Sequence, residues 1–295
     1  MEEIKKINYH SSLNKVLEFI DHNLSAELSL ALLSKIAGYS EFHFHRIFHS
    51  MMGKSVLEYV LERRYISAAS RVLYDKSSTL TQIALEYGFT SSSNFSRGFK
   101  QYFKCSPSEF KRNKDRARPV EFANTVFREY HENTNYGELF LIKFISDIHG
   151  AGIAVTGLSE NWDNPEIEQA FQRLFEWIRK NDLMKADLSI MGLTLDSPEV
   201  QKLSNCRYYP CVQIEQNVKG EGDIIVRTFN TEGRFVCFTI RREQENFADK
   251  FFTIADYLYG YFMPLKGLYP DNRPFVEYYK QNAGNLEITF CVPIK

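Results

Sequence analysis

The first third of the chain has almost none of the residues that interrupt helices. All nine prolines of the 295-residue sequence lie at or beyond Pro107, and only four of the fifteen glycines precede residue 119. Proline and glycine are the residues least compatible with a helix interior. The length allows two domains, so we predict a multi-domain protein: an all-α domain over residues 1–112, then an α+β domain whose prolines, glycines and β-branched runs suit strands and turns.

Other absences narrow the class of protein. The five cysteines form an odd set without a Cys-x-x-Cys pair, the first residues lack an apolar signal core, and no run of about 18 apolar residues could span a membrane. We therefore expect a cytoplasmic protein with no membrane partner. The second half shows no nucleophile and base at recognisable spacing, so the sequence predicts no catalytic residues, no enzyme activity and no cofactor.

Positive charge is concentrated in the N-terminal part, although the whole chain has a net charge of −1. Residues 1–118 carry 18 Lys and Arg against 12 Asp and Glu, which leaves a net charge of −7 for residues 119–295. Only the first part has the sign expected of a phosphate-binding surface. Because four of its six net charges come from residues 111–118, a basic tail is the alternative interpretation.

A pattern of helix, turn and helix occurs twice in the first domain, about fifty residues apart. Each copy starts with an apolar helical period, breaks at a glycine followed by an aromatic residue, and restarts as a polar helix that carries an arginine. The matching residues are Leu30, Leu33, Ser34, Gly38, Arg46, Phe48, Ser55 and Tyr59 in the first copy, and Leu80, Ile83, Ala84, Gly88, Arg97, Phe99, Ser106 and Phe110 in the second. The second helix of such a motif enters the major groove, and two motifs can read groove segments about 34 Å apart. The repeat therefore indicates double-stranded DNA as a partner.

Seven helices are predicted before Pro119. They cover roughly residues 10–23, 29–37, 41–52, 55–74, 79–87, 91–103 and 107–113, with N-caps at Ser40, Ser55, Thr79, Ser91 and Ser106. The long helix over 55–74 would connect the two motifs and fix the distance between their reading helices.

The two motifs also share a residue pattern with a known family. The matching residues are Ser40, Phe42, Arg46, Phe48, Gly53 and Arg64 in the first motif, and Ile83-Ala84, Gly88-Phe89, Ser93, Phe95-Ser96-Arg97, Phe99-Lys100 and Ser106-Pro107 in the second. On these residues, the stretch from Leu30 to Lys111 resembles the DNA-binding domain of the AraC/XylS family of bacterial transcription regulators. The resemblance implies a transcription regulator, which would also meet RNA polymerase.

The same resemblance assigns roles to residues of the two reading helices. It implies that DNA is contacted by Phe42, His45, Arg46, Ser92, Ser93 and Arg97, and that the core contains Phe44, Ile47, Phe48, Phe95 and Phe99. Arg46 and Arg97 could each read base edges or clamp phosphates. His45 and His49 lie four residues apart and could share a metal, but no cysteine or carboxylate completes the set at ligand spacing, so we predict no metal site.

Residues 113–136 are charged and polar and are interpreted as a linker with a short strand near 120–127. The second domain, residues 137–295, repeats a β-β-α-β-β unit. We predict strands over 138–146, 151–158, 188–195 and 206–215 around a helix over 164–181, and strands over 223–229, 233–241, 274–280 and 286–293 around a helix over 248–262. Two such units side by side would form an antiparallel sheet with both helices on one face and a concavity on the other.

A second resemblance covers the chain from about Leu139 to its end. It is carried by Asp196-Ser197-Pro198, Cys206-Arg207-Tyr208, Cys211 and Pro274-Phe275-Val276-Glu277-Tyr278-Tyr279, and Tyr209-Pro210 departs from the pattern. On these residues the region resembles the GyrI-like effector-binding domain. The resemblance implies that Glu277 lies in an aromatic cavity and meets cationic, lipophilic molecules.

The residues alone favour the same chemistry. A carboxylate that alternates with Phe275 and Tyr279 on one strand face is costly to bury unless it meets a cation, a donor or water. The candidate effector-binding residues are Glu277, Phe275, Tyr208, Trp177 and Tyr261. The alternatives are a salt bridge for Glu277 and plain core positions for the aromatic residues. The function alternatives are a domain that binds a protein partner, and a small-molecule hydrolase fused to a DNA-binding domain.

Overall fold

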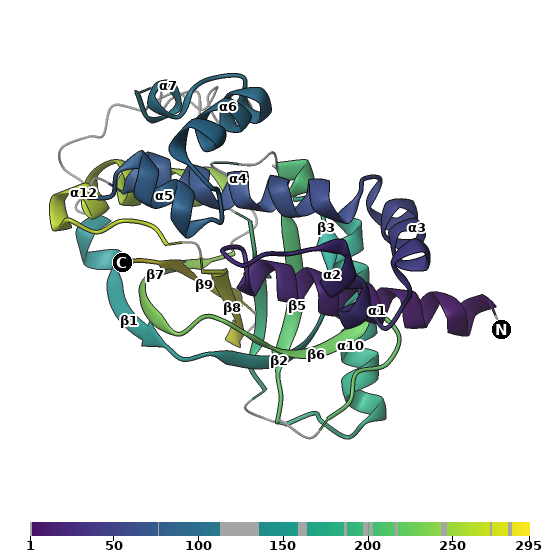
Figure 1. Cartoon of the computed structure of the whole chain (residues 1–295). Coiled ribbons are helices and arrows are strands. Elements are labelled where there is room, and N and C mark those ends of the chain that lie inside the picture. The colour runs from purple at the N-terminus through teal and green to yellow at the C-terminus, as the bar shows by residue number, and fades with distance from the viewer. Residues whose placement is uncertain are drawn as a thin grey trace. The chain divides into compact units, whose positions relative to one another are not determined.

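The computed structural model places most of the chain. It describes residues 2–75, 77–112, 136–158, 164–185, 188–196, 200, 203–215, 218–242, 247–271, 273–282 and 285–295 (Figure 1). The predicted linker and its short strand therefore lie outside the described residues, apart from Tyr136. The chain divides into two compact units, residues 1–117 and 118–295.

The described part of the N-terminal unit consists of helices. They are α1 (Glu2–His22), α2 (Leu30–Ala37), α3 (Glu41–Met52), α4 (Val56–Tyr74), α5 (Leu80–Glu86), α6 (Ser92–Phe103) and α7 (Pro107–Arg112). The seven predicted helices are confirmed, but α1 begins about eight residues earlier than predicted. No proline or glycine interrupts that segment, and the Tyr9 ring packs against the rings of Tyr39 and His43 at 5.8 Å each. Tertiary contacts thus hold a turn of helix that its own periodicity did not indicate.

The predicted starts of five helices are confirmed by N-cap hydrogen bonds. Each predicted cap accepts a hydrogen bond from the backbone N–H three residues later; the caps are Ser40, Ser55, Thr79, Ser91 and Ser106. Gly38 and Gly88, at the two turns, have φ of +77° and +75°, a region that residues with a side chain rarely adopt. The repeated glycine therefore ends the first helix of each motif.

Each reading helix is anchored by two phenylalanines. Phe44 and Phe48 of α3, and Phe95 and Phe99 of α6, are at most 1% exposed, as predicted. Ile47 is half-buried. Because the apolar side chains of α3 and α6 face inward, their polar faces are left for a partner.

The C-terminal unit contains the two predicted β-β-α-β-β units in order. The first comprises β1 (Leu141–Ile145), β2 (Ile148–Ile153), the short β3 (Val155–Thr156), α10 (Pro165–Lys180), β4 (Ile190–Thr194) and β5 (Arg207–Gln213). The second comprises β6 (Ile224–Phe229), β7 (Gly233–Arg241), α11 (Phe247–Tyr257), a π-helical turn (Leu258–Phe262), α12 (Met263–Lys266), β8 (Phe275–Asn282) and β9 (Asn285–Pro293). Short 3-10 helices cover Tyr136–Leu139 and Leu203–Asn205. Within the described ranges, no helix is long and apolar enough to cross a membrane.

The strands form one antiparallel sheet in the order β1-β7-β9-β8-β4-β5-β2-β6, with β3 beside β5 (Figure 1). Exchanging the two units only reverses this order, so a pseudo-two-fold axis passes between β8 and β4. The units are not simply side by side, because the first strand of each pairs with the second strand of the other: β1 with β7, and β6 with β2. The sequence pattern did not indicate this exchange.

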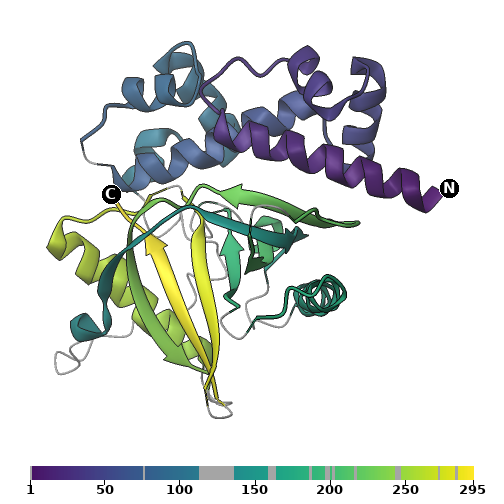
Figure 2. The same cartoon turned by 90° about the horizontal axis from the view of Figure 1, so that it is seen from below.

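The sheet is strongly curved (Figure 2). Only Ser146 and Asp147 separate β1 from β2, although these strands lie at opposite ends of the sheet, so the two ends must approach each other. Thr231 closes this corner, because its N–H donates to Asp147 Oδ1 at 2.9 Å and its hydroxyl donates to the Ser146 carbonyl at 2.7 Å.

The prediction of an open concavity on the face away from the helices is therefore wrong. Curvature brings the side chains of that face together, and they fill it as a core. Its buried members are Ile148, Met191, Leu193, Tyr209, Cys211, Phe229, Phe235, Cys237, Val276 and Cys291.

Both helices cover the other face of the sheet, as predicted. The α10 side chains Leu174 and Trp177 share a core with Ala151 and Val212. On the other side of the pseudo-two-fold axis, Ile254 of α11 shares a second core with Phe238 and Phe290, among others. The central strands β8 and β4 thus lie between the two helix-covered regions.

Candidate functional site

The exposed face of α3 brings together the three residues predicted to meet DNA. Phe42, His45 and Arg46 are all exposed, and Phe42, at 75%, has the highest exposed fraction among the large apolar side chains of the described residues. The Arg46 guanidinium lies 5.9 Å from the centroid of the Phe42 ring, within cation–π range. This helix can therefore offer a cation and an apolar ring to one partner.

On α6, Ser93 and Arg97 are exposed and Ser92 is half-buried. Arg97 donates to Asn94 Oδ1 at 2.9 Å, and Asn94 donates in turn to Thr90 Oγ1 at 2.9 Å. Asn94 was not among the residues predicted to meet DNA. The sequence did contain an indication: Asn94 carries an amide in the first turn of a reading helix, and an amide can pair with adenine through two hydrogen bonds.

Arg64 of α4 connects the two motifs. Its guanidinium donates to the carbonyls of Leu24 (2.9 Å), Ala26 (2.6 Å) and Gly88 (3.2 Å). Burial lowers the pKa of Arg64. The side chain therefore joins the segment before the first motif to the turn of the second, while the 19-residue α4 spans about 28 Å between them.

Replacing Arg64 with alanine should lower the melting temperature of the protein and weaken DNA binding. The change leaves three backbone carbonyls without their charged donor, and each such hydrogen bond contributes about 1–3 kcal/mol. Thermal unfolding measured by circular dichroism would show the loss. Arg46→Ala is the matched control, since an exposed arginine should affect DNA binding only. Equal melting temperatures for the two variants would contradict a connecting role for Arg64.

In the C-terminal unit, Glu277 lies on β8 with only 4% of its surface exposed. Its Oε2 accepts hydrogen bonds from the hydroxyls of Tyr208 on β5 (2.9 Å) and Tyr279 on β8 (2.5 Å), and these hydroxyls lie 2.5 Å apart. Among the described residues, no basic side chain forms an ion pair with Glu277 and none donates to Oε1. The predicted salt-bridge alternative is therefore not what this part of the chain shows.

The electrostatics of this cluster follow from burial. Burial raises the pKa of Glu277 to about 7, against the opposing effect of the two tyrosine hydrogen bonds. Burial, together with the neighbouring carboxylate, raises the pKa of Tyr208 and of Tyr279 well above the usual value. Near neutral pH the carboxyl can gain or lose its proton while both hydroxyls stay protonated. A bound cation would favour the ionised carboxylate.

Aromatic rings from both helices and from β8 and β9 pack on the residues next to this carboxyl, since Tyr279 donates to it and Phe290 pairs with Glu277 across the sheet. Phe171 of α10 meets Tyr279 edge to face at 5.7 Å between ring centroids. On the other side, Phe275 lies 6.0 Å from Phe290, and Phe251 of α11 packs on Phe290 at 4.7 Å. All of these rings except Phe290 are half-buried, so they lie at the boundary between the core and the surface.

The structure brings together three of the five residues predicted for the effector site, Glu277, Tyr208 and Phe275. Trp177 does not join them, because the buried stripe of α10 carries it into the core against β2 at 4% exposure. Tyr261 does not join them either. It lies on the π-helical turn, 52% exposed, and packs on Tyr257 at 5.1 Å.

Sequence reasoning left Tyr279, Phe171 and Gly192 out of the site. Tyr279 had a signal, since it follows Glu277 by two residues on the same strand face. Phe171 lies at helical spacing on the apolar face of α10. Gly192 faces Glu277 directly across the β4–β8 pairing, and only the register of the sheet reveals this.

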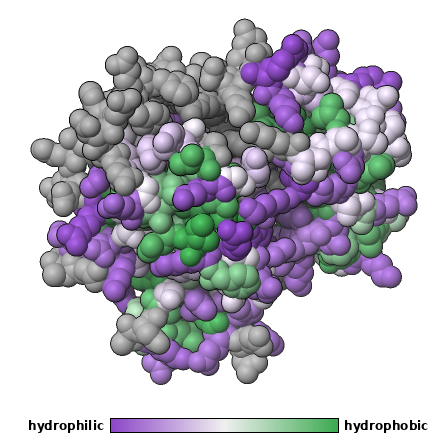
Figure 3. All heavy atoms as spheres, turned by 90° about the vertical axis from the view of Figure 1, so that its left-hand side faces the viewer, coloured by the Kyte–Doolittle hydropathy of each residue, from purple (hydrophilic) through white to green (hydrophobic). Residues whose placement is uncertain are grey.

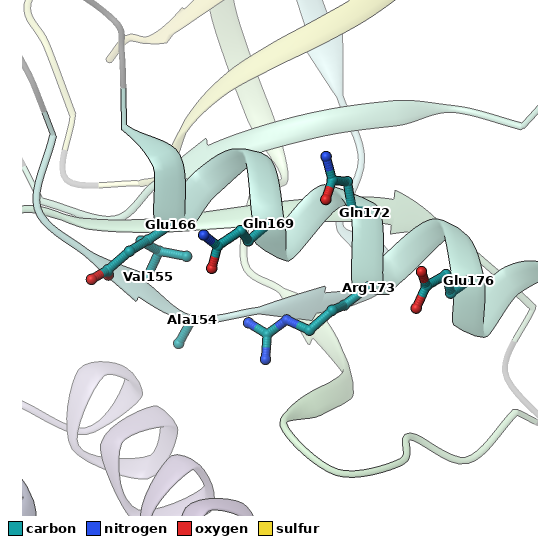
Figure 4. A pocket seen from close by; sticks show the side chains of 7 residues that line it. All are labelled: Ala154, Val155, Glu166, Gln169, Gln172, Arg173 and Glu176. Atoms are coloured by element: carbon teal, nitrogen blue, oxygen red, sulfur yellow. The ribbon is translucent and has the colours of Figure 1, made fainter.

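Two other surface features lie apart from Glu277. A polar hollow of about 470 Å³ lies along the exposed side of α10, lined by Ala154, Val155, Glu166, Gln169, Gln172, Arg173 and Glu176 (Figure 4). Apolar side chains are exposed on the edge strand β1, where Phe144 is 66% exposed, and one face of the molecule shows such patches among hydrophilic residues (Figure 3). In the described ranges, no cluster of His, Cys, Asp and Glu side chains is placed to hold a metal ion.

Two family models match the chain and define its class. Residues 33–113 match the helix-turn-helix domain (HTH_18), and residues 149–295 match the GyrI-like small molecule binding domain. The protein is thus a DNA-binding transcription regulator with a small-molecule-binding domain. Neither model describes an enzyme.

Two relatives, each matched over more than two thirds of its length, show the family. The TetD protein of transposon Tn10 from Escherichia coli is 38% identical over 107 residues, which cover 36% of this chain and 77% of TetD. The multiple antibiotic resistance protein MarA of Escherichia coli K12 is 31% identical over 100 residues, covering 34% and 78%. A solved AraC-type regulator from Chromobacterium violaceum is 27% identical, with 37% of this chain and 94% of that chain covered and a TM-score of 0.34. The chain belongs to the AraC/XylS family of transcription regulators and carries a GyrI-like domain.

Proposed function

We propose that this regulator binds a lipophilic cation at Glu277 and operator DNA through α3 and α6. The cation would be bound by residues 137–295 and the DNA by residues 1–112. The observation that carries the proposal is the buried Glu277 carboxyl, which has two tyrosine donors and no basic partner among the described residues. RNA polymerase is a proposed further partner at the promoter.

The chemistry of the Glu277 cluster supports a cationic ligand. Burying a carboxylate without a counter-charge costs several kcal/mol, and two hydroxyl donors on one oxygen offset only part of that cost. A cation beside Oε1 would supply the missing charge, and the rings of Phe171, Phe275 and Tyr279 could add cation–π attraction. The half-buried rings suit a ligand with an apolar body.

The test is a calorimetric titration of the full chain with tetraphenylphosphonium, a lipophilic cation. The control is triphenylphosphine oxide, which has similar rings but no net charge. We expect the cation to bind at least tenfold more tightly, the scale of one charged contact. Equal affinities would show that the carboxyl is not the determinant.

Cation affinity should depend on pH. Because burial raises the pKa of Glu277 to about 7, the proton competes with the cation below that pH. Affinity for tetraphenylphosphonium should fall about tenfold per unit as the pH decreases below 7, and should level off above it. Without ligand the folded state binds this proton more tightly than the unfolded state. The contribution of Glu277 to the free energy of unfolding therefore decreases as the pH rises from about 4.5 to 7. A flat affinity profile from pH 5.5 to 8.5 would contradict the role of Glu277.

A further inference from the structure

Tyr208 reaches Glu277 across an intervening strand. Tyr208 lies on β5 and Glu277 on β8, and β4 lies between them. Neighbouring strands are about 4.8 Å apart, so β5 and β8 are separated by about 10 Å. A side chain that stood upright on β5 would not span this distance. The Tyr208 ring must therefore lie across β4 to bring its hydroxyl within 2.9 Å of Oε2.

Gly192 occupies the point of β4 that the ring crosses. It pairs with Glu277 on one side and with Pro210 of β5 on the other. A Cβ atom at this position would lie 1.7 Å from the Tyr208 hydroxyl oxygen and 2.4 Å from Cζ of the same ring. Real Cβ atoms essentially never approach other atoms below 3.0 Å. Any side chain at residue 192 would thus displace the hydroxyl.

The crowding has few ways to be relieved. Tyr208 is 3% exposed, so its ring is surrounded by protein and has no free route to solvent. Gly192 is also not among the residues with a positive φ, so its backbone conformation does not require glycine. What requires glycine at this position is the space beside its Cα, which the Tyr208 hydroxyl occupies.

We propose that Gly192 is a positioning residue of the Glu277 site: because it has no side chain, it leaves the space through which the Tyr208 hydroxyl reaches the carboxyl. The contact is the 2.9 Å hydrogen bond from the Tyr208 hydroxyl to Oε2. Its importance for the effector rests on the function proposed above. Any larger residue at 192 removes the Tyr208 hydroxyl from Glu277 and so changes the protonation of the Glu277 carboxyl, the group proposed to meet the ligand.

The test follows the Glu277 carboxyl in full-length protein labelled with carbon-13 at the glutamate side chains. Its NMR resonance is assigned by its absence from Glu277→Gln. Tyr208→Phe removes one donor from the carboxylate and should raise the titration midpoint by about one unit, the scale of one hydrogen bond. Gly192→Ala should raise it by a similar amount. Because both variants lose the same contact, the double variant should show no further rise.

Gly152→Ala is the matched control. Gly152 lies in the same sheet, where a Cβ would come within 2.9 Å of the Pro210 carbonyl oxygen and 3.5 Å of Cys211, on the face away from Glu277. It should cost stability without moving the midpoint of Glu277. If Gly192→Ala leaves the midpoint unchanged, or moves it no more than Gly152→Ala does, Gly192 does not position Tyr208 and the proposal is overturned.

A folding failure would also be informative. If Gly192→Ala does not fold, adding Tyr208→Leu should restore folding, since leucine is too short to cross β4. Failure of that double variant as well would place the crowding elsewhere and overturn the proposal. Titration with tetraphenylphosphonium separates this proposal from the proposed function. Shifted midpoints without cation binding to the wild-type protein would support the positioning role and refute the effector, whereas binding with unshifted midpoints would do the reverse.

Discussion

Glu277→Gln is expected to lower affinity for tetraphenylphosphonium at least tenfold at pH 8. Glutamine keeps nearly the same volume and one acceptor oxygen for the tyrosine hydroxyls but removes the negative charge. A hydrogen-bonding contact to a charged group contributes about 1.5–3 kcal/mol, which is roughly a ten- to hundredfold change in Kd. Isothermal titration calorimetry on the full chain would measure it.

Two controls make this result specific. Glu176→Gln removes an exposed carboxylate from the polar hollow along α10 and should leave cation affinity unchanged. The melting temperature of ligand-free Glu277→Gln should not fall at pH 8, since the substitution removes a buried charge that has no basic partner in the described part of the chain. An unchanged affinity in Glu277→Gln would refute the proposed effector site and leave the DNA-binding half intact.

Arg46→Ala and Arg97→Ala should each weaken binding to a specific operator by about 1–3 kcal/mol, because each removes an exposed cation from a reading helix. The salt dependence separates two modes of binding. A base reader would lose preference at one operator position. A phosphate clamp would lose affinity for all sequences, and the slope against salt concentration would become shallower by about one.

Fluorescence anisotropy with a panel of operator variants, at several salt concentrations, would decide between these modes. Arg179→Ala, an exposed arginine of α10 in the other unit, provides the control and should leave the binding curve unchanged. Melting temperatures should also stay unchanged for both reading-helix variants. Full-strength binding by the Arg46→Ala, Arg97→Ala double variant would exclude α3 and α6 as the helices that meet DNA.

Most of the N-terminal unit was predictable from local signals. A capping serine and a left-handed glycine act within a few residues of their own position, so Ser40 and Gly38 indicated where helices begin and end. The start of α1 was not predictable in this way, since Tyr9 is held by rings that come thirty residues later in the chain. The core positions of the phenylalanines of α3 and α6 were implied by the family resemblance, and their burial confirms them.

The effector site was predictable only in part. Alternation along one strand placed Glu277 and Phe275 on the same face, and it places Tyr279 there as well. Trp177 and Tyr261 lie apart from Glu277. An aromatic residue at helical spacing does not reveal whether its helix turns it inward, as α10 does with Trp177, or outward, as the π-helical turn does with Tyr261. Gly192 and the exchange of β1 and β6 depend on register between distant strands, which a single sequence does not encode locally.

The exchanged strands join both halves of the C-terminal unit in one continuous hydrogen-bonded sheet. Glu277 and Gly192 lie at the boundary between the halves, and the hydrogen bond from Thr231 to Asp147 connects the two ends of the sheet at the opposite corner. Separating β8 from β4 to admit a ligand would also strain that corner. The backbone beneath the carboxyl is therefore held from both sides, and we expect a ligand of the proposed site to be accommodated by the Phe171 and Phe251 side chains and the two helices that carry them.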